Sequence, residues 1–264
     1  MDADLALGAE PPSMGKGIVM RWRAMVLAGL GMWAALAQSE TLVVFGGDSF
    51  APTTYLVNGK PAGTLVDILK KVGEKTGDEY EIRLYPWKRA YLHAERGEGA
   101  IVGLSNTPKR QEIFDFSEPM YYNELRLVVA KGKEFPFTRL ADLNGRTVGG
   151  GLGVSYGAEV DQAVESGLVT MERDTDPSVR LQKVLLGQLQ VAIIGHGGPG
   201  LEHILKGHPR LVDRGDELSV LPTPLTRDAL YLAASKTMKQ GAVLARFNKA
   251  LVELQHGGQI KALR

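Results

Sequence analysis

Cysteine is absent from this chain of 264 residues. Its absence excludes a disulfide framework, a zinc site built from thiolates and a lipid attached to a cysteine. The net charge is only +1, and no run of lysine and arginine interleaved with aromatic residues occurs. These features argue against a protein that binds nucleic acid. What is present, 44% hydrophobic and 23% charged residues, is the composition of an ordinary globular protein with a buried core.

The short motifs of common hydrolases and of metal or nucleotide sites are missing as well. The sequence has no Gly-x-Ser-x-Gly elbow and no Ser-His-Asp ordering. The glycine cluster of residues 149–153 lacks both the Gly-Lys-Ser/Thr of a phosphate-binding loop and the spacing of a dinucleotide fingerprint. His196, His203 and His208 lack the i, i+4 spacing with a flanking glutamate that zinc hydrolases use. We therefore expect neither a metal nor a cofactor.

Long hydrophobic runs are scarce, and the most marked one lies near the N-terminus. Residues 20–37 (MRWRAMVLAGLGMWAALA) combine a basic start, an apolar core and a small-x-small end. The apolar part contains glycines and is shorter than the ~20 residues of a membrane-spanning helix. We predict a signal peptide cleaved after Ala37, with Met20 as a candidate start and residues 1–19 outside the fold. With no lipid-bearing cysteine, this predicts a soluble protein in the periplasm of a two-membraned bacterium; the alternative is an uncleaved membrane anchor.

After this segment, the apolar patterns of strands and helices alternate along the chain. Short apolar runs between turn residues predict strands at residues 42–45, 80–85, 100–104, 125–130, 147–150, 191–194 and 230–234. Helical spacing predicts helices around residues 65–72, 87–96, 181–185 and 244–254. The alternation predicts an α/β fold with helices on both faces of a sheet. The pattern starts again after Lys131, which predicts a domain boundary near residue 130.

One arginine follows a buried strand on a tight turn. Residues 100–104 form the apolar run of that strand, and residues 105–108 (SNTP) end it. A helical turn that starts there directs free backbone N–H groups and the Arg110 guanidinium at one point, which suits a carboxylate or a phosphate. The arrangement predicts an anion clamp. The alternative is a surface arginine paired with Glu112 or Glu118.

The same residues carry a family resemblance. The stretch 97–122, with Thr-Pro-x-Arg followed by Phe-x-Phe-Ser-x-Pro-x-Tyr, resembles the family 3 extracytoplasmic solute-binding proteins, the polar amino acid receptors of ABC importers. Further motifs similar to the family occur in its order at residues 41–55, 63–69, 85–90 and 255–263. Each motif is weak alone, but five in order are hard to obtain by chance. The resemblance covers the chain after residue 40.

The resemblance implies the periplasmic binding protein type II fold, in which two α/β lobes are joined by a two-segment hinge. The first lobe would comprise residues 40–128 plus 223–264, and the second residues 129–222. Ligand would lie in the cleft between them, so that binding shifts an open–closed equilibrium. The implied function is that of a monomeric periplasmic receptor. It would deliver a small carboxylate-bearing ligand, an amino acid or a related compound, to an ABC permease in the inner membrane.

The resemblance also implies which residues bind the ligand. Arg110 would pair in a bidentate way with the ligand carboxylate. Ser105 and Ser155 would add hydroxyl groups, Ser155 at the start of a helix expected from Tyr156. Phe50 matches an aromatic residue that covers the ligand side chain. The structural alternatives are a turn serine for Ser105, an N-cap for Ser155 and a core aromatic for Phe50.

The remaining candidate positions are open to more than one interpretation. Asp48 leaves the first strand at its carboxyl end, where α/β sheets place ligands, and either pairs with a cationic group or forms a turn. Trp87 either lines the cleft or, as we favour, packs in the core. Gly195 stands where the family has an aspartate that accepts the α-amino group, and Gly103 where relatives often have a hydroxyl. His196 replaces that aspartate poorly, because a neutral imidazole accepts one hydrogen bond. A different carboxylate or a modified amino acid is therefore an alternative ligand.

Two other functions remain open. A few relatives on this fold are dehydratases that act on cyclic carboxylates. Such chemistry needs a positioned acid or base, for which Asp48, Glu124 and His196 are the candidates. Formation of product from arogenate or prephenate would decide in favour of this enzyme. A sensor module, the third possibility, would need a retained anchor and a partner domain.

Overall fold

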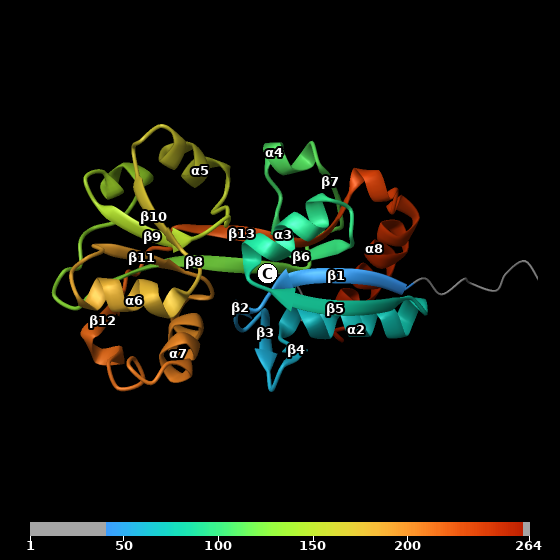
Figure 1. The fold of residues 1–264 in the computed structure, drawn as a ribbon, viewed down its shortest axis with the longest axis horizontal. Helices are drawn as coiled ribbons and strands as arrows, with labels where there is room; N and C mark the ends of the chain where they lie inside the picture. The colour runs from blue at the N-terminus through green and yellow to red at the C-terminus, as the bar shows by residue number, and fades with distance from the viewer. Residues whose placement is uncertain (1–40, 261–264) are drawn as a thin grey trace, which may run out of the picture. The chain divides into compact units, whose positions relative to one another are not determined.

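The structure, a computed structural model, describes residues 41–260, and the predicted signal peptide at residues 20–37 lies outside them. The strands are β1 (Thr41–Gly47), β2 (Ser49–Phe50), β3 (Thr54–Val57), β4 (Lys60–Ala62), β5 (Glu79–Tyr85), β6 (Ala100–Ser105), β7 (Phe114–Phe116), β8 (Tyr121–Ala130), β9 (Thr147–Gly151), β10 (Thr170–Asp174), β11 (Val191–Ile194), β12 (Leu218–Val220) and β13 (Thr226–Ser235). The main sheet has the order β10-β9-β11-β8-β13-β6-β1-β5, with β12 beside β8 and β7 beside β13 (Figure 1). A small second sheet contains β2, β3 and β4.

The helices cover both faces of the main sheet, as the alternating sequence pattern predicts. They are α2 (Thr64–Thr76), α3 (Trp87–Glu95), α4 (Pro108–Gln111), α5 (Ala158–Glu165), α6 (Pro177–Leu185), α7 (Gly197–Gly207) and α8 (Gly241–His256). Every predicted strand and helix is found, with ends that differ by a few residues. In the part of the chain that is described, no helix has both the length and the apolar character needed to cross a membrane.

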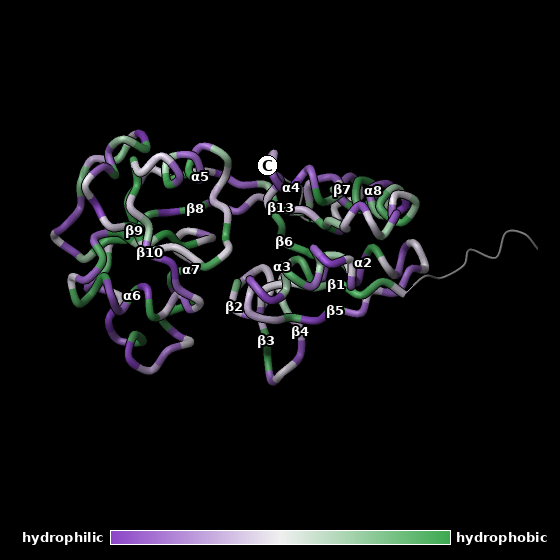
Figure 2. The backbone as a smooth tube through the Cα atoms, turned by 45° about the horizontal axis from the view of Figure 1, so that its top comes forward, coloured by the Kyte–Doolittle hydropathy of each residue, from purple (hydrophilic) through white to green (hydrophobic). Residues whose placement is uncertain are grey.

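The first hydrophobic core forms around β1, β5 and β6, which run parallel to one another. Along β1, Leu42 and Val44 pack with α2 and α8 on one face, whereas Phe45 packs with α3 on the other. This alternation follows from the two-residue repeat of a strand. Because both faces are covered, β1 and β6 are apolar almost throughout, as their green tubes show in Figure 2.

The second hydrophobic core forms around β9 and β11, which are parallel, and β8, which is antiparallel to β11. Ile193 of β11 packs with α5 on one face, and its neighbours Ala192 and Ile194 pack with α6 and α7 on the other. Residues 191–194 are all buried, which explains why this strand is a continuous apolar run rather than an alternating one.

Two long strands cross from one core to the other. β8 and β13 pair with each other over residues 121–125 and 226–230. The rest of β8 pairs with β11 and β12, whereas the rest of β13 pairs with β6 and β7. The chain therefore passes between two α/β lobes along two adjacent segments, which confirms the predicted two-segment hinge. The lobe boundaries at residues 128/129 and 222/223 stay predictions.

One helix begins later than predicted. The helix expected from Tyr156 begins at Ala158, and its N-cap is Gly157, which has a φ of 97°. Residues 152–157 form a loop instead, because the carboxylate of Asp161 accepts hydrogen bonds from the backbone N–H of Tyr156 and from the hydroxyl of Ser155. Because of this loop and the positive φ of Gly157, the helix begins two residues later than expected.

Candidate functional site

A pocket lies where the carboxyl ends of strands from both cores meet. Its walls include Ser105 at the end of β6, Gly151 at the end of β9 and Ile194 at the end of β11, together with Asp228 of the crossing strand β13. The pocket has a volume of about 140 Å³. A cavity of similar size in another protein admits a benzene-sized molecule. The carboxyl edge of α/β sheets is the usual place for a ligand, and this pocket follows that rule.

Arg110 contributes a buried positive charge to this pocket. Thr107 caps the short helix α4, and the side chain that follows turns inward, so that only 7% of Arg110 is exposed. Nη1 donates to the backbone carbonyl of Ser105 at 3.1 Å, and Nη2 donates to the carbonyl of Gly153 at 3.4 Å. Burial lowers the pKa of Arg110 below its ordinary value, and Tyr91 is the first of the groups that oppose this effect. The interpretation of Arg110 as a surface arginine is wrong because the side chain is buried.

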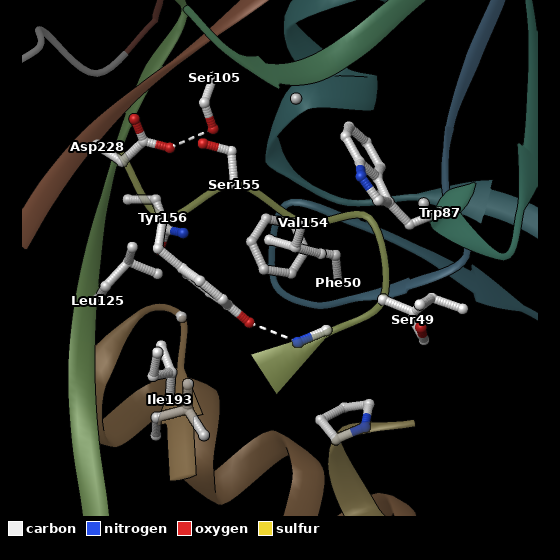
Figure 3. Close-up of a pocket in the computed structure, with 18 of the residues that line it drawn as sticks. Ser49, Phe50, Trp87, Ser105, Leu125, Val154, Ser155, Tyr156, Ile193 and Asp228 are labelled. Carbon is white, nitrogen blue, oxygen red and sulfur yellow. Dashed lines mark hydrogen bonds between the residues drawn. The ribbon is translucent and has the colours of Figure 1, made fainter. Parts of the chain in front are cut away.

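Asp228 is a second charged residue in the pocket, and the sequence analysis missed it. The Ser105 hydroxyl donates to Oδ2 of Asp228 at 2.5 Å, as the dashed line in Figure 3 shows. Burial raises the pKa of Asp228 from 3.8 to about 6, against the opposing effects of the Ser105 hydrogen bond and of Arg110; Asp161 raises it further. The sequence signal that could have pointed to Asp228 is its place as a charged residue two positions before the apolar run of residues 230–234.

Aromatic side chains form another part of the wall (Figure 3). Phe50 and Trp87 both line the pocket. The indole N–H of Trp87 donates to the carbonyl of Gly153 at 3.0 Å, so this tryptophan is anchored to the same carbonyl that Arg110 contacts. Trp87 also packs against the first core. The core interpretation that we favoured is therefore incomplete, because one side chain serves both places.

Ser155 lines the pocket, but its hydroxyl is already engaged. It donates to Oδ2 of Asp161, and Asp161 also accepts the N–H of Tyr156 at 3.1 Å. The Tyr156 hydroxyl in turn accepts the N–H of Gly151 at 2.6 Å (Figure 3). Because the helix starts later than expected, Ser155 does not sit at a helix N-terminus. Asp161 holds this loop against the pocket.

Asp48 and His196 are not among the residues that line the pocket. Asp48 donates its backbone N–H to the carbonyl of Tyr85 at 3.0 Å, which is consistent with the turn interpretation, and its neighbour Ser49 lines the pocket instead. His196 is only 8% exposed, and its Nδ1 lies 3.3 Å from the hydroxyl of Tyr121. Burial lowers the pKa of His196 to about 4, so the imidazole is neutral at physiological pH.

Gly195 lines the pocket, and the space beside it is filled from a neighbouring strand. A Cβ atom at this position would lie 3.0 Å from Oδ1 of Asn123 and 3.1 Å from Cε2 of Phe50. Oδ1 of Asn123 accepts the backbone N–H of His196 at 3.0 Å. The amide of Asn123 therefore lies beside the position where the resemblance implied a carboxylate.

A buried ion pair lies on the second-core side of the pocket. Arg180 donates from Nε and Nη2 to the two oxygens of Asp174 at 2.9 and 2.8 Å, and from Nη1 to the carbonyl of Ile193 at 2.6 Å. A Cβ at Gly149 would lie 2.7 Å from Cγ of Arg180, which explains part of the glycine cluster in β9. Within residues 41–260 there is no cluster of three or more histidine, aspartate or glutamate side chains that could hold a metal ion.

Comparison with known proteins gives consistent matches. The sequence profile of the bacterial extracellular solute-binding proteins, family 3, matches residues 42–264. The L-cystine-binding protein TcyJ of Escherichia coli strain K12 is 24% identical over 236 residues, which cover 88% of this chain and 84% of TcyJ. A solved histidine kinase sensor domain with similarity to periplasmic binding proteins has a TM-score of 0.71 at 24% identity and covers 84% of this chain and 92% of its own. An ancestral arginine-binding protein bound to arginine has a TM-score of 0.67 at 23% identity, over 83% and 94%. These structures confirm the predicted fold.

Proposed function

This chain belongs to the bacterial extracellular solute-binding proteins, family 3, and we propose that it binds a small carboxylate-bearing solute, an amino acid or a related compound, in the pocket between its lobes. The bound solute would be delivered to an ABC importer in the inner membrane. The protein would act in the periplasm as a monomer, after removal of a signal peptide at Ala37. N-terminal sequencing of the exported protein tests the cleavage, and a retained leader would favour a membrane-anchored sensor instead.

The single observation that carries this proposal is the environment of Arg110. Its side chain is buried in the pocket wall, and its hydrogen-bond partners there are the neutral carbonyls of Ser105 and Gly153. Within the described residues, no carboxylate forms an ion pair with it. A buried guanidinium without a bound anion is costly, whereas a carboxylate ligand would supply charge-assisted hydrogen bonds in the planar geometry that arginine favours.

The position of the pocket supports a receptor that closes on its ligand. Residues of the first core, such as Phe50 and Trp87, and residues of the second core, such as Val154 and Tyr156, line the same space. A ligand that touches both sets binds the closed form better than the open form, and it shifts the equilibrium by that difference in affinity. The importer would then recognise the closed form.

The test is isothermal titration over amino acids and small organic acids, with wild type and Arg110→Ala side by side. We expect one-to-one binding and a raised melting temperature for wild type. Loss of hydrogen bonds to a charged group should weaken binding in Arg110→Ala by about 10–100-fold. Arg83→Ala is the matched control, because Arg83 is exposed and pairs with Glu81 away from the pocket. Unchanged affinity in Arg110→Ala would refute the carboxylate clamp.

A dehydratase-like enzyme on the same fold is the alternative function. Of the acid–base candidates from the sequence, Asp48, Glu124 and His196, none lines the pocket. The observation that favours this alternative is Asp228, a pocket carboxylate whose pKa of about 6 suits a general acid or base. Incubation of wild type with arogenate or prephenate should give no product if the receptor function is right. Turnover that Asp228→Asn abolishes would favour the enzyme.

A further inference from the structure

Two carboxylates line the pocket, and within the described residues only one of them has an oxygen that accepts no hydrogen bond. Among the residues that line it, the acidic ones are Asp174 and Asp228. Both oxygens of Asp174 accept hydrogen bonds from Arg180. Asp228 accepts one hydrogen bond at Oδ2, from Ser105, and no group among residues 41–260 donates to its Oδ1. A cationic part of a ligand therefore finds one carboxylate available, on β13.

Asp228 and Arg110 both form a hydrogen bond with Ser105. Nη1 of Arg110 is 3.1 Å from the carbonyl oxygen of Ser105, and Oδ2 of Asp228 is 2.5 Å from the hydroxyl oxygen of Ser105. Each charge influences the other, yet in the described part of the chain they form no ion pair with each other. The pocket wall thus holds a positive and a negative group that contact the same residue, Ser105. An α-amino acid carries its carboxylate and its ammonium on one carbon atom, so it presents both charges to one part of the pocket wall.

The pocket residues at the end of β11 offer no second carboxylate for a ligand ammonium group. Gly195 has no side chain, and Asn123 and Phe50 occupy the neighbouring space. Asn123 is neutral, and its Oδ1 already accepts the backbone N–H of His196. A ligand ammonium directed to this end would lose its water without gaining a charged partner, which is unfavourable.

We propose that Asp228 binds the ammonium group of the ligand, next to the carboxylate held by Arg110, so that the pocket selects α-amino acids over acids that lack the amine. This inference rests on the proposed function and adds the class of ligand to it. The Ser105 hydroxyl acts as a positioning group, because its hydrogen bond holds Oδ2 of Asp228 and leaves Oδ1 without a donor among the described residues. Burial raises the pKa of Asp228, which is consistent with a carboxylate that forms no ion pair within the described residues.

The experiment compares ligand pairs that differ only in the amine. The common L-α-amino acids and L-cystine are titrated calorimetrically at pH 7.5, each beside its des-amino acid, such as 5-guanidinopentanoate for L-arginine and 4-carbamoylbutanoate for L-glutamine. We expect wild type to bind at least one amino acid about tenfold or more tightly than its des-amino partner. Asp228→Asn should remove this preference by weakening the amino acid only. Asp67→Asn, which removes an exposed carboxylate on α2, should keep it.

Failure of this inference is distinguishable from failure of the proposed function. A preference for the amino acid that persists in Asp228→Asn, or a wild type that binds acids but no α-amino acid, overturns the role of Asp228 and leaves the receptor function standing. Binding that Arg110→Ala leaves unchanged overturns the receptor site itself. Thermal unfolding without ligand checks that each variant folds, and Asp228→Ser replaces Asp228→Asn in the same comparison if the latter does not.

Discussion

The carboxylate of Asp228 should lower the stability of the ligand-free protein at neutral pH. Burial raises the pKa of Asp228 from 3.8 to about 6, so between these values the folded protein binds more protons at this site than the unfolded chain. The free energy of unfolding therefore falls as the pH rises through this window. Two pKa units correspond to about 3 kcal/mol, and the full cost is present above the folded pKa.

Asp228→Asn removes this cost while it keeps the shape of the side chain. At pH 7.5 the variant should gain up to about 3 kcal/mol, or roughly 6–12 °C in melting temperature for a protein of this size. This value is an upper limit, because the variant also loses the favourable interactions of the Asp228 charge with the Ser105 hydroxyl and with Arg110. At pH 4, where the folded protein binds a proton at Asp228, the difference should be close to zero.

The assay is thermal unfolding by circular dichroism from pH 4 to pH 8, without ligand, for wild type, Asp228→Asn and the exposed-site control Asp67→Asn. The gain in Asp228→Asn should grow with pH and level off above about 7, whereas the control should show no such trend. A variant that is less stable than wild type at pH 7.5, or one whose difference does not change with pH, would refute the reasoning. The stabilised variant should at the same time bind amino acids more weakly.

Three further outcomes are expected. Burial lowers the pKa of His196 from 6.5 to about 4, so stability present above pH 6.5 should be lost as the pH falls through this range. His196→Asn, which tolerates the φ of 63° at this position, should lose less stability over the same pH range in urea titrations. Gly195→Ala should destabilise by about 1–3 kcal/mol because Cβ lies against Asn123 and Phe50, and equal urea midpoints would contradict this. Trp87 is the only tryptophan after the predicted cleavage at Ala37, so its fluorescence should change on ligand binding, and Trp87→Phe should remove the signal.

The sequence alone determined the elements and the position of one key residue. β1, β6 and β11 were predicted because apolar runs between turn residues are local signals, and burial on both faces makes such runs continuous. The turn that carries Arg110 was also readable, since Thr107 and Pro108 are a local cap and start for α4. The resemblance of the motifs then supplied the fold.

Some expectations failed because local signals did not contain the deciding contact. Ser155 has the side chain of an N-cap, but the carboxylate of Asp161, six residues later, binds its hydroxyl and holds the segment as a loop. His196 follows Gly195 and is, from the sequence, a poor replacement for the aspartate that the family has at position 195. Contacts with Asn123 and Tyr121 of β8 hold it in the interior instead.

What only the tertiary structure decided is which polar and charged residues share the pocket. Ser105 and Asp228 are 123 residues apart and meet because β13 runs beside β6, so no periodicity in the sequence connects them. The same sheet order brings Asn123 next to Gly195 and leaves Asp228 as the available carboxylate. Local sequence sets which residues are buried in a strand, whereas the register between distant strands sets which of them share a wall.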